Sequence, residues 1–221
     1  GRADEKPVHR VKVKSFYMGS IPVTNIEYNN TIPRKRPKPS NLNPVVNVHW
    51  KDALKYCNEL SRMEGLEISY KFPRNADPSW DPKANGYRLP TEAEWEFAAR
   101  GGNKSQGLKY SGSNDLDQVA WYGDNSNGSL HPLGEKEPNE LGLLDMSGNV
   151  CEWCWDYYDK NSYSQAKLEN PKGPTGGLLW FKVVRGGSYL NMEHQCSVSV
   201  RSRFNGNRHR VDVGFRCVRN A

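Results

Sequence analysis

Apolar side chains recur at three- and four-residue spacing in one long stretch of the chain, residues 49–65. This spacing predicts a helix with Trp50, Leu54 and Cys57 on its apolar face and charged residues on the opposite face. Gly65 is a suitable residue to end that helix. Cys57 therefore falls where a cysteine usually serves as a small core residue.

A second helix is predicted from its first turn. Thr91 and Glu94 have the spacing of a capping box, in which each side chain accepts a hydrogen bond from the other residue's backbone N–H. Two glycines, at 101 and 102, predict the end of the helix. We expect the tryptophans around this helix and the motif after it to be largely buried, namely Trp95, Trp153 and Trp155.

Other parts of the chain carry weaker patterns. Residues 7–18 alternate valines with basic residues imperfectly, which predicts a half-buried strand, and residues 25–28 suit a short helix. The proline-rich, basic residues 31–44 favour an extended surface loop over a nuclear-localisation signal, and residues 73–86 form another loop. Residues 101–177 have no sustained period, but their aromatic and leucine content predicts compact irregular structure.

Composition narrows the classes of function. With 221 residues, seven Trp and eleven Tyr, the chain can bury a substantial aromatic core. A net charge of +6 is mild and gives no sign of nucleic-acid binding, and no apolar run is long enough to span a membrane. The number of cysteines, five, is odd, which does not indicate a disulfide framework: at least one thiol is free or paired outside the chain. Cys151 and Cys154 have redox-motif spacing, but without a flanking βαβ pattern or a second pair we interpret them as packing residues.

The C-terminal residues 183–218 have a strand-and-turn motif at each end and no regular pattern between them. Arg-Gly-Gly-Ser at 185–188 and Gly-Phe-Arg at 214–216 predict strands and turns. The residues between them show no steady period and are rich in Tyr, Asn, His, Arg and Ser, the composition of an adaptable binding surface. The alternative is an ordinary polar surface loop.

Three motifs together resemble one known family. They are GYRLPTEAEWEFAARG at 86–101, NELGLLDMSGNVCEW at 139–153, and the paired ends at 185–188 and 214–216. The combination is similar to the formylglycine-generating-enzyme (sulfatase-modifying factor) version of the C-type lectin fold. This resemblance implies a single α+β domain over residues 1–221, with two helices, small twisted antiparallel sheets and much irregular structure.

The resembled family contains both enzymes and binding proteins. Its oxidases use two cysteines after Arg-Gly-Gly-Ser; here Cys196 stands at the second position and Asn191 at the first, so the pair is incomplete. The resemblance therefore favours the variable proteins of diversity-generating retroelements, in which a C-terminal repeat like residues 183–221 is rewritten on a constant scaffold. We predict a surface-displayed, non-enzymatic ligand-binding protein. The alternative is a formylglycine-generating-type oxidase.

Adenine-directed changes of an asparagine codon reach some residue types and not others. Met192, Glu193 and Gln195 are out of reach and are left out of the predicted site, and the valines have strand core as their alternative role. The predicted ligand-binding set comprises Tyr189, Leu190, Asn191, His194, Val200, Ser202, Phe204, Asn205, Asn207, Arg208, Arg210, Val211 and Asp212. We expect an exposed cluster, with Tyr189 and Phe204 as aromatic anchors and the two end motifs in adjacent strands.

No cofactor is required by this interpretation. The resemblance implies calcium near residues 148–153, where Asn149 and Glu152 supply oxygen ligands, although the residues alone favour turn capping. The expected partner is an unknown protein or other macromolecule. A nucleic-acid site using Arg201, Arg203, Arg208 and Arg210 ranks last, because no groove-reading motif is present. We expect a cell-surface, outer-membrane lipoprotein whose signal is removed and whose lipid anchor lies outside this chain.

Overall fold

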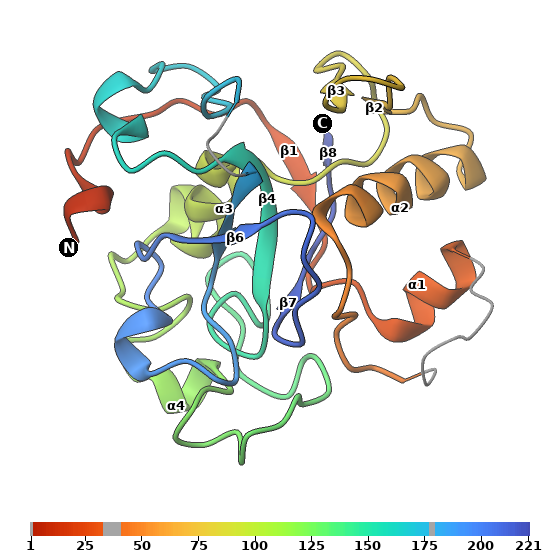
Figure 1. Ribbon diagram of the computed structural model, residues 1–221. Coiled ribbons are helices and arrows are strands. Elements are labelled where there is room, and N and C mark those ends of the chain that lie inside the picture. Colours follow the sequence, from red (N-terminus) through yellow and green to blue (C-terminus); the bar gives the residue numbers. More distant parts are fainter. Residues whose placement is uncertain (1, 33–40, 177–179) are drawn as a thin grey trace.

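The computed structural model describes residues 2–32, 41–176 and 180–221. Figure 1 shows short helices and strands joined by long irregular segments, as the resemblance implied. The helices are α1 (Asn25–Thr31), α2 (Trp50–Met63), α3 (Glu92–Ala99) and α4 (Leu116–Val119). The strands are β1 (Phe16–Met18), β2 (Tyr70–Lys71), β3 (Ser79–Trp80), β4 (Cys151–Tyr157), β5 (Phe181–Arg185), β6 (Ser202–Asn205), β7 (Val213–Gly214) and β8 (Val218–Asn220).

Both predicted main helices are present. α3 begins after Thr91, whose Oγ1 accepts the backbone N–H of Glu94 at 3.2 Å, and Glu94 Oε2 accepts that of Thr91 at 2.9 Å. The capping box therefore fixes the start of α3 as predicted. α1 is the predicted short helix, extended to Thr31, and α4 is a short helix that has no counterpart in the prediction.

A four-stranded sheet with the order β6-β5-β4-β7 lies at the centre. β7 pairs with β4 in parallel, so the expectation of purely antiparallel sheets is wrong for this pair. β4 also separates β5 from β7, so the Arg-Gly-Gly-Ser and Gly-Phe-Arg ends do not lie in adjacent strands as predicted. β4 escaped prediction because it is buried on both faces and therefore shows no alternation of apolar and polar residues.

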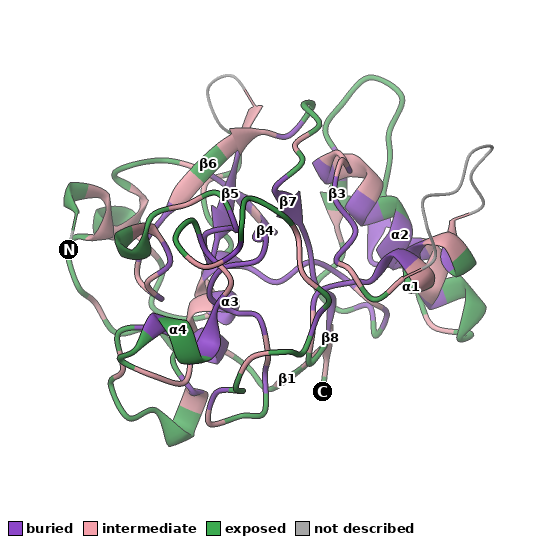
Figure 2. Cartoon of the chain, turned by 90° about the horizontal axis from the view of Figure 1, so that it is seen from below, coloured by how far each residue is buried: buried purple, intermediate pink, exposed green. Residues whose placement is uncertain are grey.

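The two faces of this sheet pack against different helices. Trp153 and Val184 belong to the cluster that contains the apolar face of α2. Cys154 and Val183 belong to the cluster that contains Trp95 of α3. Figure 2 shows that β4, β5 and β7 are mostly buried, whereas the edge strand β6 is half-buried to exposed. The predicted packing role of Cys154 is therefore confirmed.

The tryptophan prediction is confirmed for two of the three residues. Trp95 and Trp153 are fully buried, whereas Trp155 is only partly buried. Trp155 stacks on Tyr70 with ring centroids 5.3 Å apart and tilts against Trp50 at the same centroid distance. It therefore closes the outer edge of the core beside α2.

The predicted strand over residues 7–18 is largely wrong. Only β1, at its end, is a strand, and it pairs with β8. Val8 is 94% and Val11 37% exposed, so these two valines are not covered by another part of the chain. The predicted loop at 73–86 contains the short strand β3, and residues 33–40 of the predicted 31–44 loop lie outside the described residues. No helix among the described residues is long and apolar enough to cross a membrane.

Candidate ligand-binding site

Three buried arginines tie the C-terminal segment to the rest of the chain. Arg185 Nη1 and Arg201 Nε donate to the same oxygen of Glu92, at 2.9 and 2.7 Å. Arg216 Nε donates to Glu152 Oε2 at 2.8 Å. All three arginine side chains are inaccessible to solvent. Arg201 therefore cannot contact nucleic acid, which corrects its place in that hypothesis.

Asn191 and Cys196 stand at the two positions that the resemblance assigns to the thiol pair of the family's oxidases. Asn191 Oδ1 accepts the backbone N–H of Ser188 at 2.9 Å and the Ser188 hydroxyl at 3.0 Å, so the amide closes a tight turn. The Cys151 thiol donates to the same oxygen from 3.7 Å. Cys196 is fully buried, and a Cβ on Gly187 would lie 2.6 Å from its sulfur. Asn191 is thus a local structural residue here.

The two thiols near this turn are protonated at neutral pH. Burial raises the pKa of Cys196 to about 12. Burial and the nearby Asp212 carboxylate raise the pKa of Cys151 well above its usual value. A copper site or a disulfide at this pair needs a sulfur from each position, and Asn191 supplies none. These residues do not fit a two-thiolate copper site.

Three members of the predicted ligand-binding set are buried. Tyr189 is only 8% exposed; its N–H donates to Asn149 O at 2.9 Å and its C=O accepts the Ser126 hydroxyl at 2.8 Å. Val200 and Asp212 are also buried. The prediction that Tyr189 is an exposed anchor is wrong, because its main chain is fixed to two neighbouring loops and its ring is covered there.

Phe204, Arg210 and Asp212 form a layered group at the start of β4. The Arg210 guanidinium lies 4.0 Å from the Phe204 ring centroid. Its Nε and Nη2 donate to the two oxygens of Asp212 at 2.8 and 3.0 Å. The half-exposed guanidinium therefore keeps one face on the aromatic ring and has its charge opposed by a buried carboxylate. Asp212 acts as a support for Arg210 and is not itself available to a ligand.

Cys151 joins the two halves of the predicted site. Its backbone N–H donates to Asp212 O at 2.9 Å, and its thiol contacts the Asn191 amide. The turn at 188–191 and the loop at 204–212 therefore meet over the first residue of β4, although they are far apart in sequence. The exposed members of the predicted set are Leu190, His194, Asn207, Arg208 and Val211, and the half-buried ones are Asn191, Ser202, Phe204, Asn205 and Arg210.

Sequence reasoning missed two aromatic pairs beside these loops. Trp121 stacks on His131 with ring centroids 3.8 Å apart, in a loop whose Gly123 N–H donates to Asn191 O at 2.8 Å. His209 stacks on His49, at the start of α2, with centroids 3.6 Å apart. The signal for Trp121 was a lone tryptophan in a polar stretch. No sequence signal relates His49 to His209.

The suggested calcium ligands are occupied by protein partners. Both oxygens of Glu152 accept hydrogen bonds from Arg216, and Oε2 also accepts Trp95 Nε1 at 2.9 Å. Asn149 Oδ1 accepts the backbone N–H of His131 at 3.3 Å, and its Nδ2 donates to His131 O at 3.1 Å. A fully buried carboxylate that is already paired with a guanidinium does not fit a calcium ligand. Among the described residues, no group of three or more His, Cys, Asp or Glu side chains is arranged to hold a metal.

Comparison with known families identifies the family to which this chain belongs. The model of the sulfatase-modifying factor enzyme 1-like domain matches residues 1–221. The chain belongs to this sulfatase-modifying factor family. The curated formylglycine-generating enzyme of Streptomyces coelicolor is 32% identical over 80% of this chain, and the chain spans 53% of that enzyme's length.

Other proteins similar to this chain have different names. The chaperone protein LppX of Paenibacillus barcinonensis is 35% identical and aligns with 95% of this chain and 81% of its own length. The chain spans only 35% of the serine/threonine-protein kinase pkn1 of Chlamydia pneumoniae, at 31% identity. Among solved structures, Treponema denticola variable protein 1 has a TM-score of 0.85 and 31% identity, covering 96% of this chain and 86% of that one. These relatives confirm the fold and the family resemblance.

Proposed function

We propose that this chain is a non-enzymatic ligand-binding domain with a diversified binding surface. The observation that carries the proposal is the incomplete thiol pair, in which Asn191 closes a turn and Cys196 is buried and protonated. The likeness to a Treponema variable protein over nearly the whole chain supports a scaffold that presents variable loops.

The three buried arginines explain how the loops can vary without unfolding the domain. Arg185, Arg201 and Arg216 each form a buried ion pair, and they stand before, between and after the two loops at 188–194 and 204–212. The side chains between these fixed points contribute little to the core where they are exposed. We therefore restrict the predicted variable surface to its exposed and half-buried members other than Asn191. Tyr189, Asn191, Val200 and Asp212 are assigned to the scaffold.

The surface has the chemistry of a protein-binding site. Leu190 and Val211 supply exposed apolar area, and Arg208 supplies a free guanidinium. Arg210 presents its outer edge from the Phe204 ring. Such a mixture suits a protein or other macromolecule with carbonyl or carboxylate groups near an apolar patch. We further propose display at the cell surface through a lipid anchor outside this chain, and diversification of the residues by a retroelement.

Two matched display libraries test the proposal. One randomises the exposed Leu190, Asn207, Arg208 and Val211; the other randomises the buried Tyr189, Val200 and Asp212. We expect most members of the first library to fold and some to be selected for binding to hen egg-white lysozyme as an arbitrary target. Most members of the second should fail to fold. Equal tolerance in the two libraries, or an exposed library without binders, contradicts the proposal.

The alternative function is formylglycine generation, which the family's enzymes perform. We expect a copper-loaded sample to leave a Cys-x-Pro-x-Arg peptide unchanged, because one sulfur of the pair is missing. Peptide oxidation that disappears in Cys196→Ser would replace the binding proposal with the enzymatic one.

A further inference from the structure

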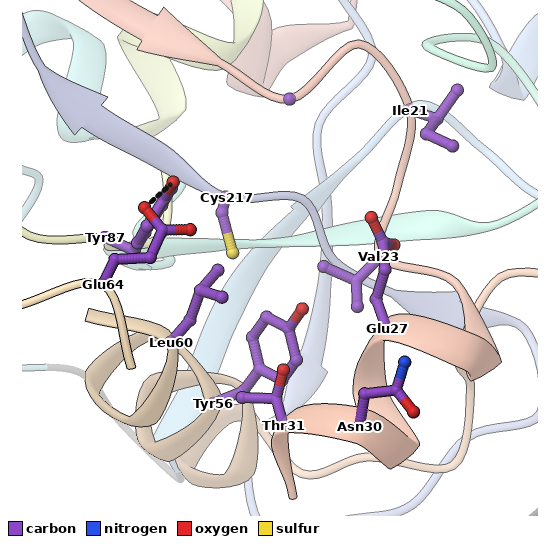
Figure 3. A pocket seen from close by; sticks show the side chains of 11 residues that line it. Ile21, Val23, Glu27, Asn30, Thr31, Tyr56, Leu60, Glu64, Tyr87 and Cys217 are labelled. Atoms are coloured by element: carbon purple, nitrogen blue, oxygen red, sulfur yellow. Dashed lines mark hydrogen bonds between the residues drawn. The ribbon is translucent and has the colours of Figure 1, made fainter. Parts of the chain in front are cut away.

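A cleft of about 370 Å³ lies away from the candidate binding loops, between α1, α2 and residues 19–23. This volume is within the range of about 300–1,000 Å³ that is usual for small-molecule sites. Figure 3 shows its side chains: Glu64 with Tyr87 at one end, Glu27 with Asn30 at the other, and Leu60 and Tyr56 between them. No residue of the predicted ligand-binding set lines this cleft.

Protein hydrogen bonds orient both carboxylates. Glu64 Oε2 accepts the Tyr87 hydroxyl at 2.9 Å. Glu27 Oε2 accepts the backbone N–H and the hydroxyl of Thr24, each at 2.8 Å, in the capping box of α1. None of the ion pairs between described residues includes Glu27 or Glu64. The described residues that line the cleft include no Lys, Arg or His, so both negative charges face it without a cation.

The middle of the cleft is apolar and rigid. Tyr56 stacks on Tyr28 with ring centroids 5.3 Å apart and meets Phe215 edge-on at the same distance, which fixes its ring. Leu60 lies on the same face of α2, and Val23 closes the wall opposite. An aliphatic chain can pack against these side chains, and the tyrosine ring also favours a nearby cation.

We propose that this cleft binds an α,ω-diammonium ligand, an aliphatic chain with an ammonium group at each end. Glu64 accepts hydrogen bonds from one ammonium and Glu27 from the other, while the methylene chain lies against Leu60 and Tyr56. Two separated carboxylates with an apolar floor between them match this arrangement of charge and hydrocarbon, and charge-assisted hydrogen bonds are the strong kind. The site is independent of the proposed binding loops, so either proposal can fail alone.

Titration calorimetry of the full chain tests the proposal with defined probes, the series from 1,3-diaminopropane to 1,6-diaminohexane and the monoamine n-pentylamine. We expect one member of the diamine series to bind best, with a Kd about ten-fold lower than that of n-pentylamine. Glu64→Gln and Glu27→Gln should each weaken that diamine by about ten-fold, and both should weaken the monoamine less.

Glu59→Gln is the matched control, because Glu59 lies on α2 near Glu64 but does not line the cleft and is paired with Arg62. It should leave binding unchanged. Glutamine also serves in a capping box, so Glu27→Gln should keep α1 folded, which the melting temperature of each variant checks. Absence of heat with every diamine, or equal binding of n-pentylamine and the best diamine, overturns the proposal.

Discussion

Glu92 holds two of the three arginine anchors, so its charge should be essential to the C-terminal segment. In Glu92→Gln the side-chain volume is kept, but Arg201 loses its only carboxylate partner among the described residues and Arg185 keeps only Glu96. Leaving a buried charge without its partner costs about 3–5 kcal/mol. The neighbouring Asp156, whose pKa burial and Glu92 raise to about 7, is relieved of a like charge, which offsets part of the loss. We expect a net loss of about 3 kcal/mol.

Urea unfolding followed by tryptophan fluorescence measures this loss, with Glu59→Gln as the control. Glu59 pairs with Arg62 at 2.8 Å on the exposed face of α2, and such surface pairs contribute only about 0–1 kcal/mol. A loss below about 1 kcal/mol for Glu92→Gln would refute the argument that the arginines are buried anchors. The expected loss would instead show that constant side chains fasten the segment at both Arg185 and Arg201.

Three further predictions concern stability. The buried thiols of Cys57 and Cys217 lie 3.7 Å apart, so a mild oxidant should join them in a disulfide, which a mass loss of two hydrogens detects. The disulfide should raise the unfolding free energy by up to about 4–5 kcal/mol. A reaction product that keeps both thiols contradicts this prediction. Thr91→Ala should cost about 1 kcal/mol by removing the cap of α3, and an unchanged urea midpoint would show that the cap is dispensable. Burial lowers the pKa of Lys182 to about 7. Above pH 7 the unfolded chain therefore binds one proton that the folded chain does not, so the unfolding free energy should rise by about 2 kcal/mol from pH 7 to 9. Lys182→Met should remove this rise, and an equally steep rise in the variant would contradict the assignment.

Local chemistry in the sequence predicted the two main helices well. Thr91 and Glu94 are three residues apart, so their reciprocal bonds depend on no distant contact. The central strand β4 was missed because both of its faces are covered, and burial on both faces removes the alternation by which strands are recognised. The strand predicted over residues 7–18 is present only at its end, where β1 pairs with β8, and Val8 and Val11 remain exposed despite the alternating pattern.

The candidate site was predicted in outline only. The residue types around Asn191 and Arg208 correctly indicated a loop-rich segment after the Arg-Gly-Gly-Ser motif. The burial of Tyr189 could not be predicted, because it depends on Asn149 and Ser126, which come from other parts of the chain. Likewise, arginine is usually exposed, so the sequence alone predicts Arg201 at the surface. Its burial depends on the buried carboxylate of Glu92, which is distant in sequence.

The central claim is that exposed loop positions vary on a fixed scaffold. Deep sequencing of the 3′ end of the gene in a growing population of the source organism tests this most directly. We expect substitutions concentrated at the codons of exposed residues such as Leu190, Asn207 and Arg208, with the codons of Arg185 and Arg201 unchanged. An invariant 3′ end, or changes spread evenly over exposed and buried codons, would contradict it.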